Sequence, residues 1–201
     1  MLDPYATALI RRPLLALARR LARWGLSANG ITLAGFALGL FAAFLIANQH
    51  YLTGAAAIFG SRLLDALDGA VARLDQPTDA GGFLDIALDF LFYASIPLAF
   101  ALADPAQNAL AAAVLLAAFM GTSSSFLAFA ALAAKLGLSS RVYPAKSIYF
   151  LGGLTEATET LACFTAMCLW PQHFAALAYG FAALCVITIV TRLWWGWKAL
   201  S

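Results

Sequence analysis

Charged residues are scarce in this sequence. Its 201 residues include 12 lysines and arginines and 10 aspartates and glutamates, so charged side chains make up 11% of the chain and hydrophobic ones 63%. Soluble domains carry about 25% charged residues. This composition excludes an ordinary soluble domain and predicts a chain that is embedded in a lipid bilayer.

Cysteine is also rare, with three residues at Cys163, Cys168 and Cys185. All three lie in long apolar runs, and none has the paired spacing of metal-ligating cysteines. We therefore expect neither a disulfide framework nor a zinc site, and we interpret these side chains as small apolar packing groups.

Long hydrophobic runs, by contrast, are abundant. A helix needs about 20 residues to cross a bilayer. Six apolar segments meet this length, and together they use most of the chain, so no room remains for a separate soluble domain. They are residues 30–48, 51–73, 83–103, 106–134, 148–170 and 173–196. The sequence thus predicts an all-α integral membrane protein with one domain over 1–201 and a six-helix bundle over 30–196.

Basic residues are missing from one side of this predicted bundle. If the N-terminus lies in the cytoplasm, the three outer joints contain His50, Asp104 and His173 but no lysine or arginine. All twelve basic residues then fall in cytoplasmic segments or in the inner halves of spans. The positive-inside rule predicts from this that both termini are cytoplasmic.

The first 25 residues precede these spans and are rich in arginine. Leu14, Leu17, Leu21 and Trp24 recur at helical spacing, and most arginines lie off this stripe. The segment is therefore predicted to be an amphipathic helix beside anionic lipid headgroups, not a cleaved signal peptide. A soluble cap on the bundle is the alternative.

Four aspartates stand at the joint between the second and third predicted spans. Asp65 and Asp68 are three residues apart near the end of one span, and Asp85 and Asp89 are four apart near the start of the next. Residues at these spacings share one face of a helix. Because the joint is short, the two helices must be antiparallel neighbours, and the two pairs are expected to face each other at the cytoplasmic side.

Four carboxylates gathered in an apolar bundle require positive charge. Arg62 and Arg73 supply two charges at most, which is not enough. Sites made only of oxygen ligands suit Mg²⁺ or Mn²⁺, and paired ions of this kind commonly clamp a phosphoryl group. We therefore predict one or two divalent ions here, with Gly69 and Gly81 leaving room for a large ligand and Arg73 meeting its phosphate oxygens.

An alternative interpretation makes these aspartates simple ion pairs or helix caps. Asp85 lies near a helix start, where Asp79 is the better capping candidate. This alternative is disfavoured because Asp65 and Asp68 lie near a helix C-terminus, where the helix dipole destabilises anions.

The pattern Asp65-x2-Asp68-Gly69-x2-Ala72-Arg73, followed by Gly81-x3-Asp85-x3-Asp89, resembles the signature of the CDP-alcohol phosphotransferases. The segment 27–32 is also similar to the family's Pro-Asn-x-x-Thr motif, with Ala28 in place of proline. The chain looks closest to a bacterial branch of the family. Seven residues separate Arg73 from Gly81, one fewer than usual, although Thr78 keeps its place three residues before Gly81.

The resemblance implies transfer of a phosphatidyl group from a CDP-linked lipid, such as CDP-diacylglycerol, to a polar alcohol in phospholipid biosynthesis, with release of CMP. It implies that two Mg²⁺ or Mn²⁺ ions are held by Asp65, Asp68, Asp85 and Asp89, and that Asp89 is the general base. It also implies a homodimer in the bacterial inner membrane, with its active site on the cytoplasmic side and no nucleic acid partner. The residues expected to contact the CDP group are Asn29, Thr32, Gly69, Arg73 and Thr78.

The acceptor side is less defined. Glu156 and Glu159 lie one turn apart in the fifth predicted span, where acidic residues are functional by default. We take them, with Arg141 and Lys146, as a candidate acceptor pocket; a purely structural glutamate pair is the alternative. Glycerol 3-phosphate, an inositol phosphate and an amino alcohol all remain open as acceptors. The polar patch 121–125 is expected to pack against a neighbouring helix rather than to bind substrate.

A different class of function would also use intramembrane acids, namely a divalent-cation transporter or metal-binding membrane protein. An ion path should place acids across the whole membrane, whereas the four aspartates cluster at one face. The enzyme is therefore the favoured prediction.

Overall fold

In the computed structural model, which describes residues 3–75, 77–137 and 153–201, the chain is all-helical. Seven α-helices and one short 3-10 turn are found in these residues, with no β-strand. The helices are α1 (Asp3–Arg23), α2 (Ala28–Ala47), α3 (Tyr51–Ala72), α4 (Asp79–Ala103), α5 (Pro105–Lys135), α6 (Ala157–Leu169) and α7 (Phe174–Leu200), with the 3-10 turn η1 at Pro171–His173.

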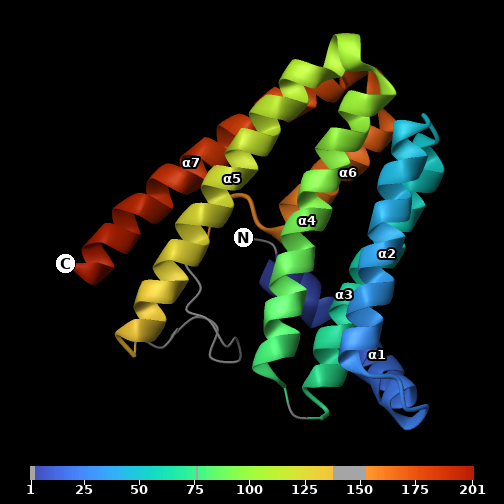
Figure 1. The fold of residues 1–201 in the computed structure, drawn as a ribbon, viewed down its shortest axis with the longest axis vertical. Coiled ribbons are helices and arrows are strands. Elements are labelled where there is room, and N and C mark those ends of the chain that lie inside the picture. The colour runs from blue at the N-terminus through green and yellow to red at the C-terminus, as the bar shows by residue number, and fades with distance from the viewer. Residues whose placement is uncertain (1–2, 76, 138–152) are drawn as a thin grey trace.

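The long helices form two groups (Figure 1). In one group α2 packs against both α3 and α4, and α1 lies against α3. In the other, α5 and α7 run side by side and lean away from the first group. Helix α4 joins the two groups because it packs against α2 and α5.

Local chemistry determines where several helices begin. The Ser27 hydroxyl accepts the N–H of Gly30 at 3.2 Å at the start of α2, and the Asp104 carboxylate accepts the N–H of Gln107 at 3.2 Å at the start of α5. At the start of α4 the cap is Thr78 and not Asp79, the residue expected to cap that helix. The reason is position, since Thr78 has the extended backbone that a capping residue needs, whereas Asp79 is already helical.

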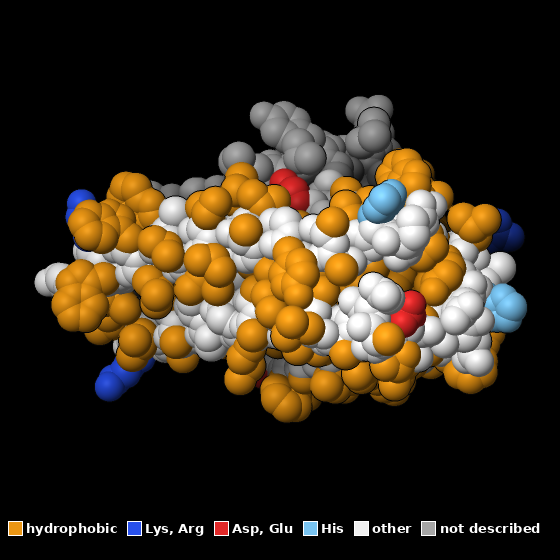
Figure 2. Space-filling view, turned by 90° about the horizontal axis from the view of Figure 1, so that it is seen from above, with side chains coloured by type: hydrophobic (Ala, Val, Ile, Leu, Met, Phe, Trp, Pro, Cys, Tyr) orange, Lys and Arg blue, Asp and Glu red, His pale blue; other side chains and the backbone are white. Residues whose placement is uncertain are grey.

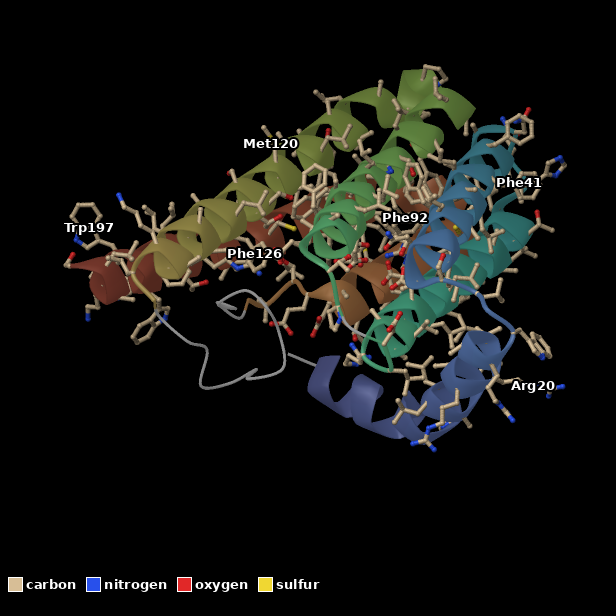
Figure 3. The ribbon with its side chains drawn as sticks, turned by 60° about the horizontal axis from the view of Figure 1, so that its bottom comes forward. Arg20, Phe41, Phe92, Met120, Phe126 and Trp197 are labelled. Atoms are coloured by element: carbon tan, nitrogen blue, oxygen red, sulfur yellow. The ribbon has the colours of Figure 1, made fainter. Side chains whose placement is uncertain are left out.

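Aromatic side chains fill the centre of the bundle. Phe100 stacks on Phe174, with ring centroids 4.6 Å apart, and also on Tyr51, with ring centroids 5.6 Å apart. Phe92 is fully buried between helices, whereas Met120 and Trp197 project outward (Figure 3). These contacts join helices that are distant in sequence.

Many large hydrophobic side chains are exposed, among them Leu52, Phe83 and Leu110. Figure 2 shows hydrophobic side chains spread over one face, where acidic and basic side chains are sparse. Monomeric soluble proteins rarely expose so much large apolar surface. The chain is therefore a membrane protein, as its composition predicted.

Four described helical segments are long and apolar enough to cross a bilayer: Ala28–Ala47, Asp79–Ala103, Pro105–Lys135 and Pro171–Leu200. Helix α3 is not among them, because every 18-residue stretch within it includes Arg62, Asp65 and Asp68. Its bounds nevertheless agree with the predicted span 51–73. The six-span arrangement stays a prediction.

The prediction of one helix over 148–170 is wrong for the first residues of that segment that the structure describes. Residues 153–156 are not helical, and α6 contains only 13 residues. At about 1.5 Å per residue this gives roughly 20 Å, shorter than the hydrocarbon core of about 30 Å. Residues 148–152 lie outside the described part of the chain.

Helix α1 packs by one edge of its predicted stripe. Ala18 is fully buried, and Leu14 and Leu21 pack beside it against a small core that includes Leu67 of α3. Leu17 remains exposed, as does Trp24 at the end of the segment, so the stripe is only half used within the molecule. A position at the membrane interface is not tested by these contacts and stays a prediction.

Gly39 provides a test of the packing between α2, α3 and α4. A Cβ atom at this position would lie 2.5 Å from the Phe92 ring and 3.0 Å from the Ser61 hydroxyl. Overpacking costs about 1–3 kcal/mol, so Gly39→Ala should lower the thermal unfolding midpoint in detergent. Gly180→Ala is the matched control, because a Cβ there meets nothing within 4 Å. Equal midpoints for the two variants would contradict this packing.

Candidate active site

Three aspartates converge where α3 ends and α4 begins. One carboxylate oxygen from each of Asp65, Asp68 and Asp85 lies within 4.8 Å of the other two. The α3–α4 hairpin produces this convergence, because each helix places its acids on the face toward the other. The predicted meeting of the two pairs is therefore found for three of the four aspartates.

Asp68 is the most buried member of the group, with 4% of its surface exposed. One of its carboxylate oxygens is fully buried and has no hydrogen-bond partner among the described residues. Leaving a carboxylate oxygen unpaired in an apolar interior is costly. This oxygen is therefore a candidate ligand atom for a cation.

Asp89 is not a member of this 4.8 Å group and is bound to an arginine. Its carboxylate accepts a hydrogen bond from the Arg62 guanidinium, and the same guanidinium nitrogen lies 3.3 Å from a carboxylate oxygen of Asp65. Arg62 also donates to the Ser61 hydroxyl at 3.3 Å. One arginine thus joins the aspartates of α3 and α4.

The hairpin between α3 and α4 is closely packed against α2. The Thr78 hydroxyl accepts the Gly81 N–H at 3.1 Å. A Cβ on Gly81 would lie 2.9 Å from the side-chain oxygen of Asn29, so glycine is needed for this approach. Thr78 and Asn29, both predicted CDP contacts, are therefore brought to the same place.

All five predicted CDP contacts line one open cleft of about 1570 Å³, together with Asp68, Asp85 and Asp89. At one end Arg73 folds over α3, where a Cβ on Gly69 would lie 3.3 Å from its guanidinium. Thr32 is buried beside Asp68. The structure thus brings the predicted residues together, while their roles stay predictions.

The far end of the same cleft contains a buried arginine that the sequence analysis did not single out. Arg192 of α7 is 8% exposed and donates to the Thr122 carbonyl of α5 at 3.0 Å. Its guanidinium carbon lies 5.7 Å from the centroid of the Phe126 ring. Its Nε is buried with no hydrogen-bond partner among the described residues. The sequence contained a signal for this residue, since an ionisable side chain within a span is functional by default. Arg192 was instead interpreted as part of the positive-inside pattern.

Glu156 and Glu159 form a capping box at the start of α6. The Glu156 N–H donates to the Glu159 carboxylate at 3.2 Å, and the Glu156 carboxylate accepts the Gly153 N–H at 3.1 Å. These contacts agree with the alternative interpretation, in which the two glutamates have a structural role. Glu156 nevertheless also lines the cleft. Arg141 and Lys146 lie outside the described residues, and the acceptor-pocket prediction is not tested.

Thr188 of α7 holds the non-helical turn that precedes α6. Its hydroxyl oxygen accepts the N–H groups of Leu154 and Thr155 at 3.1 and 3.2 Å, and the Thr155 hydroxyl lies 3.0 Å away. Thr188 itself donates to the Leu184 carbonyl at 3.1 Å. This contact fixes the turn against α7, close to Arg192.

The polar patch 121–125 of α5 has two roles. Gly121 packs closely against Ile189 of α7, as expected for small residues between helices. Thr122 and Ser123, however, line the cleft, so this part of the patch faces the site as well as a neighbouring helix.

Comparison with known proteins identifies a relative of the whole chain and a relative of part of it. Residues 26–194 match the CDP-alcohol phosphatidyltransferase family. The inner membrane protein YnjF of Escherichia coli is 52% identical over 201 residues, which cover 100% of this chain and 98% of that protein. An archaetidylinositol phosphate synthase of Methanothermobacter thermautotrophicus is 46% identical over 83 residues, 41% of each chain.

The fold is shared with a phosphatidylinositol phosphate synthase of Mycobacterium tuberculosis. Its crystal structure with CDP-DAG bound has a TM-score of 0.74 at 24% identity, covering 92% of this chain and 94% of that one. Its complex with manganese and citrate has a TM-score of 0.72 at 24% identity, covering 92% and 88%.

A substitution at Thr188 tests the far end of the cleft. Thr188→Val keeps the side-chain shape but leaves the Leu154 and Thr155 N–H groups without their acceptor, which costs about 1–3 kcal/mol. We expect a lower thermal midpoint and faster hydrogen exchange at these two amides. Thr191→Val is the control, because within the described part of the chain that hydroxyl bonds to the Ile187 and Thr188 carbonyls of its own helix. Unchanged exchange in Thr188→Val would contradict the anchoring role.

Proposed function

Because the chain belongs to the CDP-alcohol phosphatidyltransferase family, we propose that it transfers a phosphatidyl group from CDP-diacylglycerol to a phosphorylated polyol, with release of CMP. Membership of an enzyme family confirms the predicted enzyme class over the transporter alternative. The observation that carries the proposal is the group of three aspartates, with its unpaired buried oxygen, at a cleft lined by the predicted CDP contacts.

The donor set fits a divalent cation. All its ligand atoms are carboxylate oxygens, which suit Mg²⁺ or Mn²⁺, and one buried oxygen of Asp68 has no hydrogen-bond partner among the described residues. Asp65, Asp68 and Asp85 would hold the ion, with Asp89 beside them. When bound, such an ion would neutralise diphosphate oxygens and stabilise the leaving group. The manganese complex of the structural relative supports this assignment.

The chemical step assigned to this chain's own residues is a proton transfer. Asp89 lines the cleft and would take the proton from the acceptor hydroxyl. The hydroxyl oxygen forms a bond to the lipid-linked phosphorus, and the bond from that phosphorus to the CMP oxygen breaks. Arg62 would hold one oxygen of Asp89 in place during this step.

The CDP group would lie at the α2–α4 end of the cleft. Arg73 would bind phosphate oxygens across Gly69, where the lack of a side chain allows its approach. Asn29, Thr32 and Thr78 would contact the nucleotide with their hydrogen-bonding side chains, since all three line the cleft.

The acceptor would lie at the other end. Arg192 offers a buried guanidinium with an unpartnered Nε, which suits an anionic group. Glu156, buried at the same end, suits acceptor hydroxyls. The relatives that synthesise archaetidylinositol phosphate and phosphatidylinositol phosphate support an inositol phosphate among such acceptors. Glycerol 3-phosphate would place its phosphate at Arg192 equally well, but it has fewer hydroxyls to bond to Glu156.

For the whole protein we propose a bacterial inner-membrane location, six spans in a single domain, a homodimer and a cytoplasmic active site. The E. coli relative supports the location, and the one-sided distribution of basic residues supports the orientation.

The main experiment supplies the purified chain in nanodiscs with CDP-diacylglycerol, Mg²⁺ or Mn²⁺, and a panel of polar alcohols, and measures CMP release. Asp89→Asn should lower kcat by about 10²–10⁴-fold, the usual contribution of a general base, and removal of metal with EDTA should abolish turnover. Asp104→Asn is the matched control, since asparagine also caps helices. Absence of CMP release with every acceptor would overturn the proposed function.

The acceptor assignment has its own test. Arg192→Gln should raise KM for a phosphorylated acceptor by about 10–100-fold, from the loss of a charged hydrogen bond worth about 1.5–3 kcal/mol, while KM for CDP-diacylglycerol stays unchanged. Lys198→Gln, an exposed position on the same helix, is the control. An equal rise in both KM values would argue against an acceptor site at Arg192.

A further inference from the structure

The turn at residues 153–156 lies between two charged groups of the cleft, the Arg192 guanidinium and the Glu156 carboxylate. The Gly153 N–H donates to that carboxylate at 3.1 Å. On its other side Gly153 faces α7, where a Cβ atom on it would lie 3.2 Å from Nη2 and 3.4 Å from Nε of Arg192. Gly153 therefore adjoins both groups.

The close approach of this turn to α7 depends on the missing side chain of Gly153. A Cβ atom there would overlap the methyl group of Thr188 as well as crowd the guanidinium of Arg192. Protein interiors are close-packed, so an added methyl group forces its neighbours to shift. A larger residue at this position would therefore move the turn away from α7 or displace the guanidinium.

Thr188 holds the turn in this place. It is fully buried, and its hydroxyl oxygen accepts the N–H groups of Leu154 and Thr155 at 3.1 and 3.2 Å. Thr188 and Arg192 are four residues apart on α7, so they share one face of that helix. The face that anchors the turn is thus the face that presents the guanidinium.

The two charged groups are themselves held in place. Arg192 donates to the Thr122 carbonyl of α5 at 3.0 Å, and Glu156 takes part in the capping box with Glu159. Glu156 also acts electrostatically on Arg192, and both residues line the cleft. Their separation therefore depends on where the turn stands relative to α7.

We propose that Gly153 is a specificity-determining residue, because it fixes the separation between the Arg192 guanidinium and the Glu156 carboxylate. Thr188 is the positioning residue that keeps it there. This inference rests on the acceptor end of the proposed function. A phosphorylated polyol of matching length engages both groups at once, with its phosphate at Arg192 and a hydroxyl at Glu156. A small anion engages Arg192 alone.

The test compares two probes that use different parts of this arrangement, myo-inositol 1-phosphate and inorganic phosphate. Their dissociation constants are measured by isothermal titration calorimetry on the full chain in nanodiscs with Mn²⁺, and the binding that Arg192→Gln abolishes is assigned to this site. The unmodified chain should bind the inositol phosphate about 10–100-fold more tightly than inorganic phosphate, the usual effect of one more hydrogen bond to a charged group.

The informative variant combines Gly153→Ala with Thr188→Ser. The serine keeps the oxygen that holds the turn and removes the methyl group that the new Cβ would overlap, so Arg192 is the neighbour that must move. The preference for the inositol phosphate should then fall about 3–10-fold, as expected when that hydrogen bond is weakened but not removed. Inorganic phosphate can follow the displaced guanidinium, whereas the larger probe cannot reach both groups. A purely structural role would weaken both probes equally.

Two single variants serve as controls. Thr188→Ser alone should keep the preference, because the oxygen that holds the turn remains. Gly54→Ala overpacks a contact outside the cleft lining, since its Cβ would lie 2.6 Å from Ile46. It should lower the thermal midpoint and leave the preference unchanged.

An unchanged preference in the folded double variant would overturn the inference, and so would equal affinities of the two probes for the unmodified chain. If the double variant does not fold, Thr188→Val decides in its place, because loss of the acceptor oxygen releases the turn and should lower the preference as well. Failure of the proposed function looks different: the unmodified chain would then show no Arg192-dependent binding of either probe and would release no CMP.

Discussion

The accumulation of negative charge inside an apolar helix bundle is the constraint on which this structure depends. Carboxylates in a medium of low dielectric constant repel one another and lose their hydration, so each needs a cation or a hydrogen-bond donor. Arg62 serves Asp65 and Asp89, and the buried oxygen of Asp68 has no such partner within the described chain. Arg62 thus offsets part of this negative charge, and the carboxylate oxygens that remain suit a divalent ion.

The bundle supports this charge by close packing around α3. Gly39 and Gly35 of α2 allow α3 to approach, and Ser61 bonds to the Gly35 carbonyl across that contact. Phe92 then covers the Arg62 guanidinium from α4. Small residues of α2 and an aromatic residue of α4 therefore surround the ion pair of Arg62. The pair must stay together there, because burial of a lone charge is strongly unfavourable.

The sequence predicted the local features of this molecule well and the long-range ones poorly. Helix bounds such as those of α3 and α5 follow from apolar length and capping residues, and the meeting of Asp65, Asp68 and Asp85 follows from helical spacing and a short joint. Arg192 and Thr188 were missed because their partners, Thr122 and Leu154, are distant in the chain. The break before α6 was missed for a related reason, since Glu156 and Glu159 were considered as ligands and not as helix caps.

This difference between the two ends of the cleft has a physical consequence. The α2–α4 end is built from neighbouring segments that are held together by one hairpin. Four acids lie there, so few substitutions preserve the charge balance. The far end is built from α5, α7 and the turn at residues 153–156, which meet through single hydrogen bonds such as that of Arg192 to Thr122. Contacts of this kind can change one at a time without disturbing the aspartates. If the far end takes the acceptor, as proposed, it is the part of the cleft where specificity can vary while the aspartate group is retained.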